Sequence, residues 1–254
     1  MRNVCLILEY DGTNLNGFQA QPIKELVTVQ GELEKALHKI TGEEIKIIGA
    51  GRTDAGVSAD RQYANFFTNT VIPTQRLRMA INTKLPPEIS VKESFDVPME
   101  FNARYSAISR SYRYRILNSP ARSALRRNSV FHFKQELDFE LMKEAWLTLR
   151  GKYNFTAFCR ADTDRKIMTC TIKDTNCWQD KDEFVFTITS DTFLRGMVRF
   201  LIGTTILIGL KRLEPDDLMD IVRCCDRSRV SLSASGVGLS LSDVIYPPEV
   251  FEFK

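Results

Sequence analysis

The sequence is poor in the side chains that build metal centres and imidazole-based catalytic sites. It has two histidines, His38 and His132, and six cysteines, none of which belongs to a C-x-x-C pair. His38 falls in an amphipathic helix pattern and His132 lies between two phenylalanines, so both are expected at packing or surface positions. Zinc sites need Cys and His ligands at short, regular spacing. We therefore expect no metal centre and no reaction that needs histidine as its general base.

Long apolar runs are also absent. A membrane-spanning helix needs about 20 apolar residues, whereas the longest run, Leu201 to Leu210, contains glycines and threonines and is expected to form a buried helix. The N-terminus enters a strand-like pattern without the apolar stretch and cleavage site of a signal peptide. With 43% hydrophobic and 26% charged residues, the composition is that of a soluble globular protein. We expect a cytoplasmic protein with buried cysteine thiols.

Acidic residues are missing from one long window of the chain. Between Phe101 and Gln135 there is no Asp or Glu, although the formal net charge of the whole chain is only +3. The window holds the basic residues Arg104, Arg110, Arg113, Arg115, Arg122, Arg126, Arg127 and Lys134, and the tyrosines Tyr105, Tyr112 and Tyr114. Guanidinium groups bind phosphate, and aromatic rings stack on exposed bases. The pattern favours a nucleic-acid surface over a solvated basic face without a partner.

Hydrophobic periodicity predicts a β-α-β-β-α-β order for the first hundred residues. Thr28 is a candidate N-cap for the first helix, and the pair Pro86-Pro87 ends the second. Strands are expected at 2–10, 44–49, 63–68 and 89–95, and helices at 29–40 and 73–84. This order is that of a ferredoxin-like or RRM-like domain.

The rest of the chain predicts the same order of elements, although the two halves share no sequence repeat. Strands are expected at 109–117, 169–179, 183–190 and 239–245, and helices at 139–149, 193–208 and 216–224. The predicted fold class is α+β, with two ferredoxin-like domains whose antiparallel sheets flank a basic central cleft. We place the domains at 1–104 and 105–254, because the basic window begins at this boundary.

A short loop after the second predicted strand carries the most informative carboxylate. Asp54 follows Arg52 in a segment bounded by Gly51 and Gly56. An exposed aspartate beside an arginine can act as a nucleophile or a base. It can equally be a turn residue that hydrogen-bonds the local backbone. Local chemistry alone leaves both interpretations open.

The loop resembles the aspartate loop of the TruA family of tRNA pseudouridine synthases, and other segments match that family in the same order. They are 10–13 and 17–22, 28–30, 76–77 with 82–86, 101–107 with 112–114, 155–159, 193–194 with 197–199 and 203–204, and 238–241 with 244–246. Each segment is weakly specific alone, but together they cover nearly the whole chain. The resemblance implies an enzyme that isomerises uridine without a cofactor or metal. It also implies tRNA as substrate, on the 3′ side of the anticodon arm, and a homodimer.

The resemblance also implies roles for particular residues. Asp54 corresponds to the catalytic aspartate, and Arg199 to the arginine that pairs with it. Tyr112 corresponds to the tyrosine that stacks on the target base, and Arg52 to the arginine that helps to extrude the nucleotide. The residues that depart from the family pattern are Ser58, where histidine is usual, and Arg195, Gly196 and Lys166.

Two glutamines are candidates for RNA contacts, and one other function fits the sequence. Gln19 and Gln21 are weaker candidates for RNA contacts. The alternative is a non-catalytic RNA-binding protein built from two RRM-like domains, which the element order and the basic window fit equally well. RRMs carry paired aromatic residues on their central strands, and residues 44–49 have none.

Overall fold

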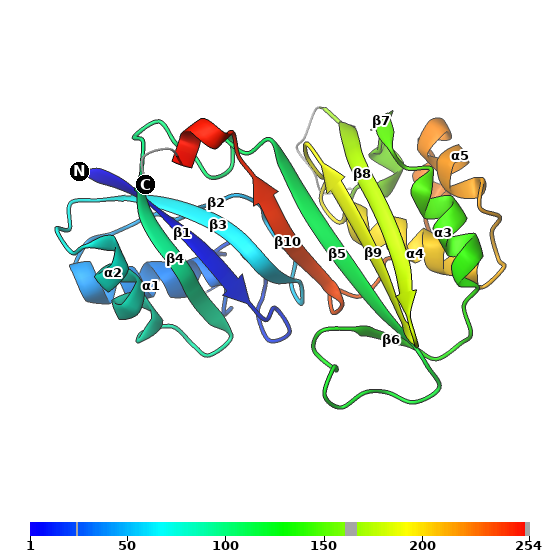
Figure 1. The fold of residues 1–254 in the computed structure, drawn as a ribbon, viewed down its shortest axis with the longest axis horizontal. Coiled ribbons are helices and arrows are strands. Elements are labelled where there is room, and N and C mark those ends of the chain that lie inside the picture. Colours follow the sequence, from blue (N-terminus) through cyan, green and yellow to red (C-terminus); the bar gives the residue numbers. More distant parts are fainter. Residues whose placement is uncertain (24, 161–166, 252–254) are drawn as a thin grey trace. The chain divides into compact units, whose positions relative to one another are not determined.

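The computed structural model describes residues 1–23, 25–160 and 167–251. The described residues contain ten β-strands and five α-helices and divide into two compact units. The first unit consists of Met1–Ser109 together with the chain from Ser240 onward, and the second of Arg110–Leu239. Strands and helices occur in both units (Figure 1), which confirms the predicted α+β class. None of the described helices combines the length and apolar character needed to cross a bilayer.

The first unit is built on a sheet with the strand order β4-β1-β3-β10, and β2 also pairs with β3. Its elements are β1 (Arg2–Tyr10), α1 (Val29–Thr41), β2 (Ile48–Gly49), β3 (Ser58–Thr68), α2 (Thr74–Asn82), β4 (Ile89–Val97) and β10 (Leu239–Ile245). Pairing is antiparallel except between β10 and β3, where Ser240 lies opposite Ser58. Helices α1 and α2 lie on one face of the sheet (Figure 1). Without β10, this is the ferredoxin-like order that the sequence predicts.

Strand β2 is shorter than predicted because the backbone before it bonds to a helix. The prediction was a strand from 44 to 49, but only Ile48 and Gly49 pair with β3. Ile47 instead donates its N–H to Glu34 Oε1 of α1 at 3.1 Å and accepts from Gln30 Nε2 at 3.3 Å. Two side chains of α1 therefore satisfy the peptide groups that a longer ladder would have used.

The other face of this sheet is covered by an aromatic cluster. Tyr246 packs 5.0 Å from Tyr63 and 5.3 Å from Phe101, measured between ring centroids. Phe251, from the C-terminal turn η3 (Pro248–Phe251), contacts Tyr63 and the Phe95 ring. Tyr63, Phe101 and Tyr246 are each at most 6% exposed. These rings pack on one another, so they are not available to stack on bases as the aromatics of an RRM do.

The N-cap of α1 makes a testable contribution to stability. Thr28 is buried, and its side chain accepts a hydrogen bond from Gly31 N at 3.2 Å. Thr28→Ala should lower the free energy of unfolding by about 1 kcal/mol, measured by urea denaturation, because an orphan N–H loses its acceptor. Thr28→Ser keeps the acceptor and should lose clearly less. Equal losses in the two variants would assign the effect to the methyl group instead of the cap.

The second unit pairs its sheet in the order β5-β9-β8-β7, with β6 alongside β5. Its elements are β5 (Ser109–Asn118), β6 (Phe131–Phe133), α3 (Phe139–Leu147), β7 (Gly151–Asn154), η1 (Thr156–Phe158), β8 (Thr169–Asp180), β9 (Glu183–Ser190), α4 (Met197–Gly209), α5 (Asp217–Cys224) and η2 (Arg227–Arg229). Trp146 of α3 packs against Phe186 and donates to Thr187 O of β9, which fixes the helix on the sheet. The short strands β6 and β7 were not predicted.

Helix α4 begins four residues later than predicted, at Met197 instead of Phe193. Gly196 has a φ of 75°, which ends any continuous helix from the preceding residues. Met197 N bonds to Leu194 O in a turn, and the helix follows from there. The apolar run Leu201 to Leu210 lies largely inside α4, and most of it is buried, as expected.

The chain returns to the first unit after Leu239. The predicted division was a single boundary near Arg104, whereas the units change after Ser109 and again at Ser240. The reason for the return is the parallel pairing of Ser240 and Leu241 with β3.

The cysteines are thiols, and four of them are buried as expected, but Cys224 is exposed and Cys225 half-buried.

Candidate functional site: an aspartate loop and an arginine–tyrosine cluster

The Asp54 loop is held by a glutamine and a tyrosine from neighbouring strands. Gln62 of β3 donates to Gly51 O at 2.8 Å and accepts from Gly51 N at 3.3 Å. Tyr10, the last residue of β1, shares a 2.8 Å hydrogen bond with Thr53 Oγ1. Burial raises the pKa of the Tyr10 phenol to about 12, although its bonds with Thr53 and Gln62 favour ionisation. The phenol therefore stays neutral and acts as a hydrogen-bonding support near Asp54.

The other side of the loop is held by the segment that follows β1. Phe18 N donates to Thr53 O at 3.1 Å, and Gly56 N donates to Leu15 O at 3.3 Å. Gly12 N donates to Ser58 Oγ at 3.0 Å, so the serine that departs from the family pattern anchors the loop. Val57 N closes a turn onto Asp54 O at 3.2 Å. The backbone of Asp54 is thus fixed from both sides while its side chain is half-buried.

Two glycines allow this close approach. A Cβ on Gly12 would lie 2.1 Å from Val57 O, and one on Gly17 would lie 2.7 Å from Thr53 O. Gly17 also has a φ of 88°, a conformation that residues with side chains rarely adopt. Only glycine therefore lets the 12–17 segment lie against the loop.

The structure brings three of the predicted site residues to this part of the first unit. Arg52 is exposed, two residues before the half-buried Asp54. Gln19 is exposed and follows Phe18, whose N–H bonds to the loop at Thr53. Gln21 is exposed as well, and its Nε2 donates to Asn16 O at 3.3 Å. Tyr10 and Gln62, which hold the loop, were not predicted as site residues. The predicted strand began at residue 63 and so did not include Gln62, whereas β3 begins at Ser58.

The second unit holds the other two predicted residues near a buried tyrosine. Arg199 lies in the first turn of α4, is half-buried and donates from Nε to Ala234 O at 2.7 Å. Ala234 N in turn donates to Arg199 O at 2.9 Å. Burial raises the pKa of the Tyr114 phenol, and the Arg199 guanidinium partly offsets this effect. Arg199 is therefore not an ordinary helix-surface arginine.

Tyr112 lies two residues before Tyr114 on β5, on the same face of the strand. Its ring packs edge-on against Phe193 at 5.0 Å between centroids and an interplanar angle of 89°. Tyr112 is half-buried, whereas Tyr114 is 1% exposed and donates to Ser235 O at 3.0 Å. The cluster thus contains one buried tyrosine anchored to Ser235 O and one half-buried tyrosine that packs on Phe193.

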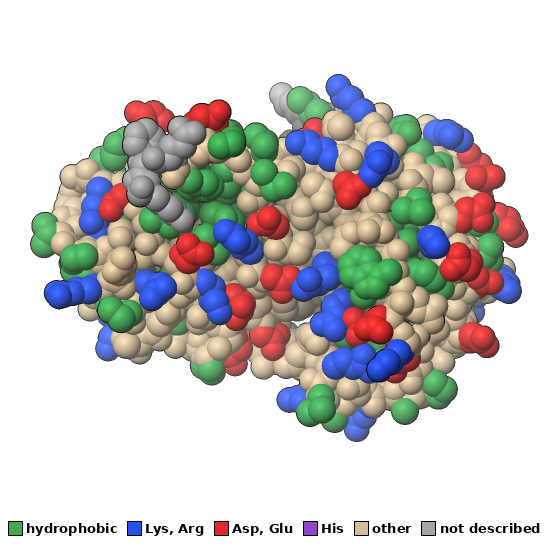
Figure 2. Space-filling model, viewed as in Figure 1, with side chains coloured by type: hydrophobic (Ala, Val, Ile, Leu, Met, Phe, Trp, Pro, Cys, Tyr) green, Lys and Arg blue, Asp and Glu red, His purple; other side chains and the backbone are tan. Residues whose placement is uncertain are grey.

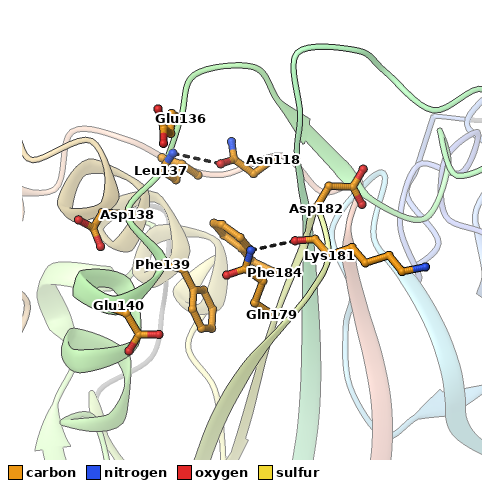
Figure 3. Close-up of a pocket in the computed structure, with 10 residues that line it drawn as sticks. All are labelled: Asn118, Glu136, Leu137, Asp138, Phe139, Glu140, Gln179, Lys181, Asp182 and Phe184. Carbon is orange, nitrogen blue, oxygen red and sulfur yellow. Dashed lines mark hydrogen bonds between the residues drawn. The ribbon is translucent and has the colours of Figure 1, made fainter.

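A cavity of the second unit is lined by none of these residues. It has a volume of about 390 Å³ and lies beside the start of α3 and the β8–β9 hairpin (Figure 3). Asn118 accepts from Leu137 N at 3.0 Å and Gln179 donates to Lys181 O at 2.8 Å at its edge. Its lining includes four carboxylates, Glu136, Asp138, Glu140 and Asp182. This much negative charge disfavours RNA phosphates, so we do not assign the functional site there.

The other departures from the family pattern have structural roles or lie elsewhere. Arg195 O accepts from Arg160 N at 3.1 Å, and Gly196 starts α4 as described above. Lys166 lies outside the described residues. In the part of the chain that the structure describes, no group of three or more His, Cys, Asp or Glu side chains is placed to hold a metal ion.

Comparison with known proteins places this chain among RNA-modifying isomerases. A family model described as tRNA pseudouridine synthase matches residues 6–106 and 145–247. The chain belongs to the tRNA pseudouridine synthase family. The matched ranges contain Gln19, Gln21, Arg52, Asp54 and Arg199, whereas Tyr112 falls between them. Membership of an enzyme family favours an isomerase over the non-catalytic RNA-binding alternative.

Full-length bacterial relatives support the same assignment. The chain is 42% identical to tRNA pseudouridine synthase A of Acetivibrio thermocellus and 39% identical to that of Caldicellulosiruptor bescii, each over 97% of this chain and 100% of the relative. It is 41% identical to tRNA pseudouridine synthase A 2 of Clostridium tetani, over 96% of this chain and 99% of the relative.

Proposed function

We propose that the protein converts uridine to pseudouridine in the anticodon stem-loop of tRNA, on its 3′ side, with Asp54 as the catalytic carboxylate. The observation that carries the proposal is the fixed backbone of the Asp54 loop. The glycine segment 12–17, the buried Gln62 and Tyr10 hold the backbone of the loop that carries this half-buried aspartate. Catalysis depends on such pre-organisation, because a misplaced group loses most of its effect.

The proposed reaction is an internal rearrangement of the nucleotide. The bond between N1 of the base and C1′ of the ribose breaks, the uracil turns, and a bond forms between C5 and C1′. The proton on C5 is lost and N1 gains one, so the product is an isomer and the proposal includes no cofactor or metal. The Asp54 carboxylate can attack C1′, attack the uracil ring or remove a proton from C2′. All three roles need an ionised carboxylate, the usual state of aspartate near neutral pH.

We assign supporting roles to the other site residues. Arg199 pairs with Asp54 and orients it. Tyr112 stacks on the target base, whose extrusion from the stem-loop costs a few kcal/mol. Arg52 helps to extrude that nucleotide, and Gln19 and Gln21 contact the RNA. The proposal includes a cytoplasmic homodimer as the working form.

Mapping of the modified nucleotide tests the substrate assignment. The purified protein is incubated with unmodified tRNA transcripts, and pseudouridine is located by carbodiimide labelling and primer extension. We expect product at uridines on the 3′ side of the anticodon arm, the position that the family resemblance implies. Transcripts with cytidine at the mapped positions should give no product. Product confined to another arm of the tRNA would contradict the anticodon assignment, and no product on any tRNA would contradict the reaction.

A further inference from the structure

In the structure, two arginines of the basic window, residues 101–135, pair with carboxylates of the same chain. Arg115 and Arg126 both bond to Glu183, which is only 7% exposed, and Arg126 also lies 3.4 Å from Asp182. These two arginines are paired with carboxylates at the β8–β9 hairpin. Arg126 thereby fastens the loop between β5 and β6, residues 119–130, to that hairpin. The basic residues that face a partner outside the protein must be sought among the others.

Two other arginines of the loop line a small cavity. The cavity has a volume of about 210 Å³ and is lined by Leu117, Arg122, Ser123, Arg127, Val130, Phe131, His132 and Val237. No carboxylate belongs to this lining. Figure 2 shows several Lys and Arg side chains, with Asp and Glu side chains beside some of them, at the lower edge of the second unit where this loop lies. The cavity therefore differs in charge from the larger acidic one beside α3.

The cavity walls are held in place by bonds within the loop. Val130 N and Ser129 N donate to Arg126 O at 3.1 and 2.9 Å, which links the loop to the residue anchored by Glu183. Arg127 Nη1 donates to Ala124 O at 2.9 Å. The His132 Nε2 lies 2.8 Å from Ser119 O, so this nitrogen is the donor and Nδ1 faces the other direction. The Arg127 side chain and the backbone of residues 126–130 are thus held by bonds within the loop.

We propose that this cavity binds a backbone phosphate of the tRNA, with Arg122 and Arg127 as its ligands. Guanidinium groups are suited to phosphate because they donate several hydrogen bonds in one plane. The apolar part of the lining, which includes Val130 and Phe131, can accommodate the sugar next to that phosphate. A free inorganic phosphate would gain nothing from this apolar wall, so we favour a polynucleotide.

The cavity lies far enough from the proposed base-stacking tyrosine to serve a different nucleotide. Tyr112 and Leu117 are five residues apart on β5, which corresponds to about 16 Å along a strand. The loop also lies in residues 107–144, which the family model does not match. The inference rests on the proposed use of tRNA as substrate and adds a site remote from the reacting uridine.

The test compares tRNA binding by the whole protein and by two double variants. Arg122→Ala/Arg127→Ala should weaken binding of an unmodified tRNA transcript about tenfold at low salt. It should also reduce the slope of log K against log salt by about one, as expected for one lost phosphate contact. Lys39→Ala/Lys152→Ala removes the same charge from exposed residues outside the cavity and should change affinity less than twofold. KM should rise in the arginine variant while kcat at saturating tRNA stays within twofold.

Two further arms separate the possible outcomes. Arg122→Lys/Arg127→Lys keeps the charge and should restore the wild-type salt slope but only part of the affinity, because lysine cannot donate several hydrogen bonds in one plane. Circular dichroism of the alanine variant excludes misfolding as the cause of a loss. Inorganic phosphate alone is titrated into the wild-type protein and followed by NMR. Wild-type tRNA affinity and salt slope in the alanine variant would overturn the inference, even if inorganic phosphate enters the cavity. Failure of the proposed function would appear as a wild-type protein that binds no tRNA. Failure of the cavity inference alone would appear as wild-type tRNA binding in the alanine variant, so the two failures are distinguishable.

Discussion

Replacing Asp54 with asparagine should abolish pseudouridine formation while leaving the fold and tRNA binding intact. Asparagine has the same shape as aspartate but cannot carry the negative charge, so the carboxylate chemistry is removed without a cavity. Loss of a group on which the chemical step depends lowers kcat by roughly 10⁴- to 10⁶-fold in well-studied enzymes. The measurement is single-turnover formation of pseudouridine on an anticodon stem-loop transcript, with tRNA affinity and thermal unfolding recorded for the same preparation.

Asp180→Asn is the matched control for this experiment. Asp180 is exposed at the end of β8, and its replacement removes the same charge far along the chain from the loop. This variant should keep wild-type activity. The proposal would be wrong if Asp54→Asn retained a tenth or more of the wild-type rate. It would also fail if both variants lost activity equally, because the effect would then follow from net charge.

Gly12→Ala should reduce activity about a hundredfold although it changes no charged or polar side chain. The new Cβ would lie 2.1 Å from Val57 O and 2.4 Å from Val57 C, and neither backbone atom can rotate away. The segment after β1 and the Asp54 loop must therefore move apart, and Asp54 moves with its loop. A displacement of about 1 Å at a catalytic group can cost roughly 10²-fold in rate. The measurement is kcat at saturating tRNA, with circular dichroism to confirm that the fold is retained.

Gly42→Ala is the control that separates displacement of the loop from the general cost of losing a glycine. Gly42 has a φ of 73° at the C-terminus of α1, and nothing lies within 4 Å of a Cβ built there. This variant should be destabilised by about 1 kcal/mol, because alanine is strained at positive φ, but it should keep wild-type kcat at a permissive temperature. Equal loss of kcat in both variants would contradict the proposed role of Gly12.

Local patterns predicted much of the fold because they report interactions between residues close in sequence. Thr28 caps α1 as expected, since an N-cap and its target lie three residues apart. The β8–β9 hairpin forms around Lys181 and Asp182, where the alternation of apolar residues breaks. The same patterns overestimated β2 and began α4 too early, because Glu34 and Gly196 act there through contacts and dihedral angles that periodicity does not contain.

The candidate site was predicted less completely. The sequence singled out Asp54 and Arg199 by their motifs, and it does not reveal that Gln62 and Tyr10 hold the aspartate loop. The basic window was recognised as a whole, but pairing with Glu183, almost sixty residues after Arg126, separates Arg115 and Arg126 from Arg122 and Arg127. Composition counts charges and cannot show which of them are neutralised at close range.

The sequence by itself determined the α+β class, the position of most helices and strands, the family and the residue types available for chemistry. These depend on hydrophobic period, capping residues and motifs, all of which are local. Only the tertiary structure decided that Gly12 and Gly17 lie against the Asp54 loop, that Arg199 bonds to Ala234 O, and that the chain returns from Ser240 to pair with β3. Each of these contacts joins residues separated by dozens of positions. They form because burial of the core brings distant backbone groups together, and every buried N–H and C=O must then find a partner.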